Sequence, residues 1–124
     1  MAQMRSPNLL IERFMKFALG CNLFVKSLPK TEGDRIYGRQ LIRSSSSIGA
    51  NYVEATAATS RKDFINDSNR ARKEAKESLY WLQLLKQIND DHSKEIEDLL
   101  DEGEQLLKIL AATVKTAKEN EHSS

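Results

Sequence analysis

The chain has 124 residues, of which 40% are hydrophobic and 30% are charged, with five glycines and two prolines. This length suits a single domain spanning residues 1–124, and the apolar fraction is too high for a disordered chain. The 19 basic and 18 acidic side chains leave a net charge of +1, which excludes a uniformly basic nucleic-acid binder and an acidic tail protein.

Charge is distributed unevenly along the chain. Residues 1–43 carry a net charge of +5, residues 44–88 carry +2, and residues 89–124 carry −6. A basic front and an acidic back can pair within one bundle or between subunits, or the front can meet a polyanion.

A single cysteine, Cys21, leaves no partner for an internal disulfide. No apolar run reaches the roughly 18 residues that a membrane span needs, and the N-terminus lacks the apolar core of a secretory signal. These features predict a protein of the reducing cytoplasm with no membrane partner.

Apolar spacing predicts a first helix over residues 7–28. Ser6 and Pro7 have the pattern of an N-cap followed by proline at the first helical position, and Pro29 ends the helix. The expected buried stripe comprises Ile11, Phe14, Ala18, Cys21, Val25 and Leu28. Cys21 on this stripe is expected to be an inert apolar side chain rather than a nucleophile.

A second helix is predicted over residues 33–58. Thr31 and Asp34 resemble a capping box, with Asp in place of the usual Glu. The expected stripe is Leu41, Ser45, Ile48, Tyr52 and Ala55. The run Ser44–Ser47, followed by Gly49, favours close helix packing over a patch of serines that contacts a ligand.

Two further helices are predicted over residues 61–89 and 93–119. Ser60 and Asp63 form another cap, and the polar cluster 89–93 suits a turn. A polar tail is expected at 120–124. The expected stripes are Phe64, Ser68, Ala71, Ala75, Ser78, Leu82 and Leu85, then Ile96, Leu99, Gly103, Leu106, Leu110, Thr113 and Ala117. Four helices with short connections predict an all-α fold, an antiparallel up-down-up-down four-helix bundle.

Some apolar residues lie off these stripes and are candidates for an oligomer interface. They are Met15, Leu19 and Leu23 in the first helix and Tyr80, Trp81, Leu84 and Ile88 in the third. Such residues are costly to expose and are typical of interface centres. The two sets differ in composition, so contact between them in neighbouring subunits is heterologous and closes into a ring or grows into a filament. The alternative is that a loop or a bulkier bundle covers them.

Two polar ridges follow the second helix. Arg35, Arg39 and Arg43 recur every four residues and could follow phosphates, with Arg61, Lys62 and Lys73 as further nucleic-acid candidates. The alternative is a solvated face, or ion pairing to the acidic fourth helix. A candidate polar network comprises Arg43, Ser47, Asn51 and Glu54. The ends of this network lie about 16 Å apart along the helix, so each end needs a partner on another helix or subunit.

The sequence shows no constellation typical of catalysis. Its histidines are His92, in a turn, and His122, in the tail. Glu119 and His122 have the spacing of half a di-iron motif, without the interior carboxylates that would complete it. Phosphate loops and paired Cys-x-x-Cys motifs are also lacking. We expect no enzyme activity, no metal and no cofactor.

Several stretches form a recognisable set of motifs. They are Gln40–Arg43, Ser47–Asn51 with Glu54, Ser60–Phe64 and Glu77–Leu82, joined by Leu28-Pro29, Glu32 and Leu106-x-x-Ile109-Leu110. Together they resemble the 23S rRNA intervening-sequence protein family over roughly residues 9–118. The pattern is also similar to the accessory variability determinant of diversity-generating retroelements.

The resemblance implies a small bacterial four-helix-bundle protein, often encoded within insertions in 23S rRNA genes, that assembles as a ring-like homopentamer. In the retroelement relatives a basic surface binds nucleic acid and a reverse transcriptase, and the near-neutral charge departs from that pattern. We therefore expect a non-enzymatic oligomer whose partners are its own copies, RNA or another nucleic acid, and an unidentified protein. The alternative is a scaffold with no nucleic-acid ligand.

Overall fold

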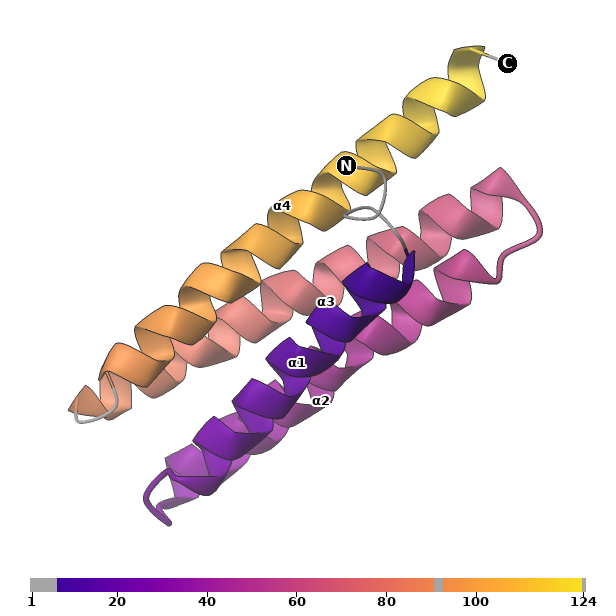
Figure 1. The fold of residues 1–124 in the computed structure, drawn as a ribbon. Helices are drawn as coiled ribbons and strands as arrows, with labels where there is room; N and C mark the ends of the chain where they lie inside the picture. The colour runs from indigo at the N-terminus through magenta and orange to yellow at the C-terminus, as the bar shows by residue number, and fades with distance from the viewer. Residues whose placement is uncertain (1–6, 91–92, 124) are drawn as a thin grey trace.

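A computed structural model describes residues 7–90 and 93–123, and the side chains of residues 9–90 and 94–120. The described residues form four helices: α1 (Pro7–Lys26), α2 (Glu32–Thr56), α3 (Arg61–Ile88) and α4 (Ser93–Ser123). Consecutive helices run in opposite directions and pack side by side (Figure 1). This arrangement confirms the expected all-α four-helix bundle.

The helix ends follow the expected capping chemistry. The Thr31 and Ser60 hydroxyls accept hydrogen bonds from the amides of Asp34 and Asp63, each at 3.1 Å. Helix α4 continues through Ser123, so most of the segment 120–124 is helical rather than a tail. Polarity alone does not end a helix, and no glycine or proline interrupts this segment. The proposed cap at Ser6 lies outside the described residues.

The core is formed by the facing stripes of all four helices. The expected α2 stripe is buried throughout. In α1, however, Phe17 and Phe24 are buried while Ala18 and Val25 are only partly covered. Likewise Ile65, Leu100 and Val114 take the buried places expected for Phe64, Leu99 and Thr113. Periodicity identifies the buried face, but it does not rank adjacent residues that straddle its centre.

The serines of α2 pack closely, as the sequence favours. Ser44 is fully buried, and its hydroxyl lies 2.8 Å from that of Ser78 on α3. Ser45 and Ser47 bond to carbonyl groups of their own helix, at 3.3 and 2.8 Å. These contacts satisfy the buried hydroxyls of Ser44 and Ser45 and the half-buried hydroxyl of Ser47, while Ser46 is exposed. The described geometry therefore supports packing rather than a ligand patch.

A buried polar contact fastens the start of α2 to the end of α3. Asp34 is only 3% exposed. Its carboxylate accepts hydrogen bonds from the Thr31 hydroxyl at 2.6 Å and from the Asn89 side-chain amide. The sequence predicts a local cap at Asp34 and a turn at Asn89, whereas the structure joins the two residues across 55 positions of the chain.

Candidate interaction surfaces

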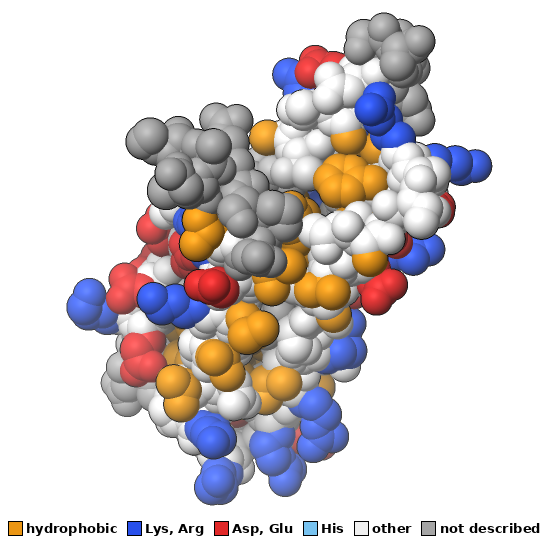
Figure 2. All heavy atoms as spheres, turned by 45° about the vertical axis from the view of Figure 1, so that its right-hand side comes forward, with side chains coloured by type: hydrophobic (Ala, Val, Ile, Leu, Met, Phe, Trp, Pro, Cys, Tyr) orange, Lys and Arg blue, Asp and Glu red, His pale blue; other side chains and the backbone are white. Residues whose placement is uncertain are grey.

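The outer face of α1 exposes large apolar side chains. Met15, Leu19 and Leu23 are 58%, 59% and 66% exposed. In Figure 2, hydrophobic side chains gather on one face of the molecule and are flanked by charged side chains of both signs. No part of the described protomer covers these three residues, so the candidate α1 surface is available for contact with another molecule.

The candidate interface residues of α3 divide into an exposed group and a half-buried group. Tyr80 and Ile88 are exposed, at 58% and 48%, whereas Trp81 and Leu84 are half-buried. The Trp81 ring stacks on Tyr37 of α2 with centroids 6.0 Å apart, and its indole N–H donates to Glu77 at 2.8 Å. Trp81 is therefore held by its own protomer, while still forming part of an aromatic patch. Tyr37 was not identified from the sequence, because only α2–α3 packing brings it to Trp81.

Five candidate basic residues lie free at the surface. Arg35 and Arg39 on α2, and Arg61, Lys62 and Lys73 on α3, are exposed and pair with no carboxylate among the described residues. Their charges are therefore available to a ligand, although the positions by themselves do not establish that one binds.

Arg43 differs from the other candidate basic residues because carboxylates surround it. It pairs with Glu74 at 3.4 Å, pairs with Glu77, and donates to Gln40 at 3.0 Å. The Trp81 N–H and the Arg43 guanidinium together lower the pKa of Glu77. Arg43 thus pairs with helix α3, and not with the acidic fourth helix that the charge pattern offers as an alternative.

The remaining members of the candidate network do not form a chain of side-chain contacts. Ser47 donates to the Arg43 carbonyl, and the Asn51 amide donates to the Ser47 carbonyl at 2.9 Å. Glu54 is exposed, with no partner among the described side chains. The ridge therefore consists of bonds to its own backbone, with one ion-pair cluster at the Arg43 end.

Two further ion pairs join helices at the bundle seams. Arg13 of α1 makes a two-point contact with Glu102 of α4, at 2.8 and 2.9 Å. Lys86 of α3 pairs with Glu97 of α4. Two-point arginine pairs fix geometry as well as charge, so the Arg13 contact helps to hold α1 against α4, which are the least extensively packed of the neighbouring helices.

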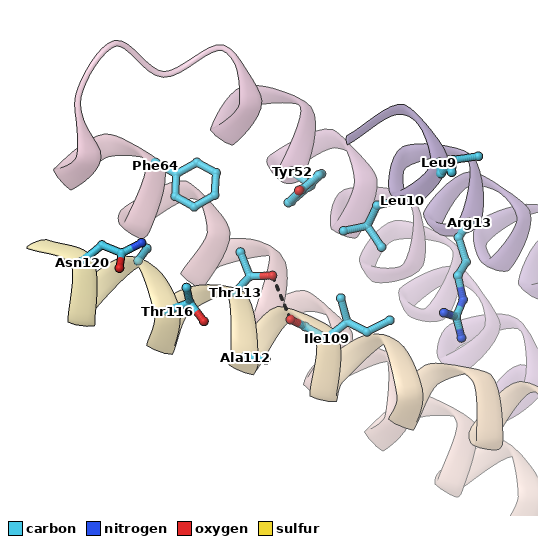
Figure 3. Close-up of a pocket in the computed structure, with 11 residues that line it drawn as sticks. Leu9, Leu10, Arg13, Tyr52, Phe64, Ile109, Ala112, Thr113, Thr116 and Asn120 are labelled. Carbon is cyan, nitrogen blue, oxygen red and sulfur yellow. Dashed lines mark hydrogen bonds between the residues drawn. The ribbon is translucent and has the colours of Figure 1, made fainter. Parts of the chain in front are cut away.

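A largely apolar groove of about 770 Å³ opens where α1 and α4 diverge. Figure 3 shows Phe64, Tyr52 and Leu10 facing Thr113 and Ile109 of α4 across it. Its lining is Leu9, Leu10, Arg13, Tyr52, Phe64, Ile109, Ala112, Thr113, Thr116, Ala117 and Asn120. Thr113 donates to the Ile109 carbonyl at 2.9 Å, so that hydroxyl is already engaged within the helix.

The residues considered for chemistry do not assemble into a site in the described part of the chain. Cys21 is fully buried, and burial raises the pKa of its thiol to about 12, which leaves little thiolate at neutral pH. No group of three His, Cys, Asp or Glu among the described side chains is placed to hold a metal ion. The side chains of His92 and His122 lie outside the described residues.

Within the described residues, no helix combines the length and the apolar character of a membrane span. No curated protein matches the sequence.

A solved structure and a family model do match. The structure is described as a protein with unknown function from the S23 ribosomal protein family of Bacteroides thetaiotaomicron VPI-5482. It is 34% identical, has a TM-score of 0.79, and the match covers 88% of this chain and 97% of that one. The family model, described as 23S rRNA-intervening sequence protein, matches residues 8–112. The chain therefore belongs to the 23S rRNA-intervening sequence protein family.

Proposed function

We propose that this protein is a non-enzymatic, self-associating four-helix bundle that binds RNA. The observation that carries the proposal is the contrast between paired and unpaired cations. Arg13, Arg43 and Lys86 are matched by carboxylates between helices, whereas Arg35 and Arg39 extend into solvent on one ridge. Two unpaired cations four residues apart on one helix face suit a polyanion, and the family name points to RNA.

Self-association would multiply this row. The α1 surface and the aromatic patch on α3 differ in composition, so contact between them in neighbouring copies is heterologous and suits a closed ring. A homopentamer is the ring that the family resemblance implies. Several copies of a weakly binding row that act together bind far more tightly than one copy.

Binding of a labelled RNA at several salt concentrations tests the proposal. We expect fluorescence anisotropy to show binding at low salt that weakens steeply as salt rises, because bound cations release counterions from phosphates. The double substitution Arg35→Glu with Arg39→Glu should weaken RNA binding relative to the parent protein at the same salt concentration. The control is Glu54→Gln, which changes the charge of an exposed α2 residue by removing a negative charge rather than by adding one.

Two results would contradict the RNA proposal. One is an absence of binding at low salt, and the other is binding insensitive to salt. Self-association without RNA binding would instead support the scaffold alternative, in which the partners are copies of this chain or another protein.

A further inference from the structure

A small hollow lies on the α3–α4 seam, away from the Lys86–Glu97 pair. It measures about 340 Å³. Its lining is Asn69 and Arg72 of α3 with Ala111, Val114, Lys115, Lys118 and Glu119 of α4. Val114 is buried in a cluster with Ile65 and Ala117, so it gives the hollow an apolar floor. We call this feature the Arg72–Lys118 hollow.

The cations of this hollow are not balanced. Arg72, Lys115 and Lys118 pair with no carboxylate in the described part of the chain. Glu119 is the one carboxylate in the lining. Cations that gather over an apolar floor concentrate positive potential, and a bound anion would relieve their mutual repulsion.

Arg72 is oriented for such an anion. Its Nε–H donates to the Asn69 side-chain oxygen at 2.9 Å, which fixes the plane of the guanidinium. That bond leaves the two terminal amino groups for another acceptor. An arginine held in this way can present two parallel donors to a phosphate.

The hollow is part of a larger basic end that the helix topology creates. Residues 106–118 contain three lysines and no carboxylate, whereas residues 93–105 contain six carboxylates and one lysine. Because α3 and α4 are antiparallel neighbours (Figure 1), the lysine-bearing half of α4 lies beside the start of α3. Arg61, Lys62 and Lys73 belong to that same half of α3.

We infer that the Arg72–Lys118 hollow binds the phosphodiester backbone of an RNA strand. This inference rests on the RNA binding proposed above and adds a second contact surface for the RNA, because the α3–α4 hollow lies at the opposite end of the bundle from Arg35 and Arg39. Cations on two neighbouring helices suit a chain of phosphates better than one isolated anion, because successive phosphates can meet successive side chains. Glu119 opposes binding at one edge of the hollow.

The test measures the affinity of the full-length protein for a fluorescein-labelled single-stranded RNA at several salt concentrations. For Lys115→Ala with Lys118→Ala we expect roughly a tenfold loss of affinity at low salt. The slope of log affinity against log salt, which is negative, should become shallower by about 1.4, at about 0.7 for each phosphate contact. Arg72→Gln should also weaken binding, and Glu119→Gln should strengthen it.

The matched control is Lys26→Ala with Lys94→Ala. It removes the same two charges at the opposite end of the bundle, where α1 ends and α4 begins, and should leave the salt slope near that of the parent protein. Circular dichroism checks that the variants fold, which is expected because all four lysines are exposed.

Three outcomes would overturn the inference in distinguishable ways. Unchanged RNA affinity in the Lys115 and Lys118 variant would place the contacts elsewhere and leave the proposed function standing. An absence of RNA binding by the parent protein would refute both. If the Lys115 and Lys118 variant lost self-association but kept its RNA affinity, the hollow would instead bind the acidic half of α4 from another copy.

Discussion

Small and polar side chains at the centre of the bundle determine how closely its helices approach. Ser44 and Ser78 meet hydroxyl to hydroxyl between α2 and α3, and Gly49 brings the α2 backbone close to Phe14 of α1. Helical spacing predicted that this face of α2 is buried. It could not pair Ser44 with Ser78, because that contact depends on how two helices are aligned along their length.

Ser68 is a residue at which a substitution should stabilise the protein. It is fully buried, and its hydroxyl has no hydrogen-bond partner among the described residues. Ser68→Ala removes the unsatisfied group and should raise the free energy of unfolding by about 1 kcal/mol. Ser78→Ala is the matched control and should lower it by about 1 kcal/mol, because Ser78 bonds both Ser44 and the Glu74 carbonyl. Urea unfolding measures both, and a destabilised Ser68→Ala variant would contradict this account.

The Cys21 thiol should make the free energy of unfolding decrease as the pH becomes alkaline. Burial raises its pKa to about 12, so the unfolded thiol ionises before the folded one. This contribution is complete below about pH 8.5, the pKa of a free thiol, and is lost as pH rises toward 12. Urea midpoints of the parent protein should therefore fall faster with rising pH than those of Cys21→Ala. Urea midpoints that fall in parallel with pH for the two proteins would contradict a raised pKa for the Cys21 thiol.

At the scale of the helices, sequence periodicity predicted four elements, their order and their buried faces. Periodicity misplaced the centre of the buried face of α1, because Phe17 and Ala18 are adjacent in the chain and are both apolar. Packing against the other helices decides between such neighbours, and a single helix does not contain that information. The Asp34–Asn89 contact was missed for the same reason.

A pair of glycine substitutions tests the close approach of α1 and α2. A Cβ at Gly38 would lie 2.8 Å from Cγ1 of Val25, a stiff β-branched side chain, so Gly38→Ala should cost about 1–3 kcal/mol of stability. A Cβ at Gly20 would meet only Leu99, at 3.4 Å, so Gly20→Ala should stabilise by about 0.5–1 kcal/mol through helix propensity. Thermal unfolding measures both, and equal effects would show that the α1–α2 spacing is not as tight as described.

At the scale of the whole molecule, the near-neutral net charge conceals a surface on which basic and acidic side chains are segregated. The split by segment predicted a basic front and an acidic back. It did not show that α4 is itself divided, with its carboxylates toward one end and Lys108, Lys115 and Lys118 toward the other. Only the antiparallel packing joins those lysines to the cations of α3. The candidate surface on α1 was identified from the sequence because its three apolar residues lie off the buried stripe.

The proposed self-association has the largest consequences at this scale, because a closed ring would multiply every surface described above. Sedimentation velocity of the parent protein and of Leu19→Glu with Leu23→Glu tests it directly. Both leucines are more than half exposed, so the variant should fold, whereas Trp81→Ala would also remove contacts within the protomer. Val53→Glu, at a 43% exposed position outside both candidate surfaces, serves as the control. We expect the parent and the control to sediment as a closed oligomer and the double variant as a monomer. A parent protein that remains monomeric at high micromolar concentration would contradict the account.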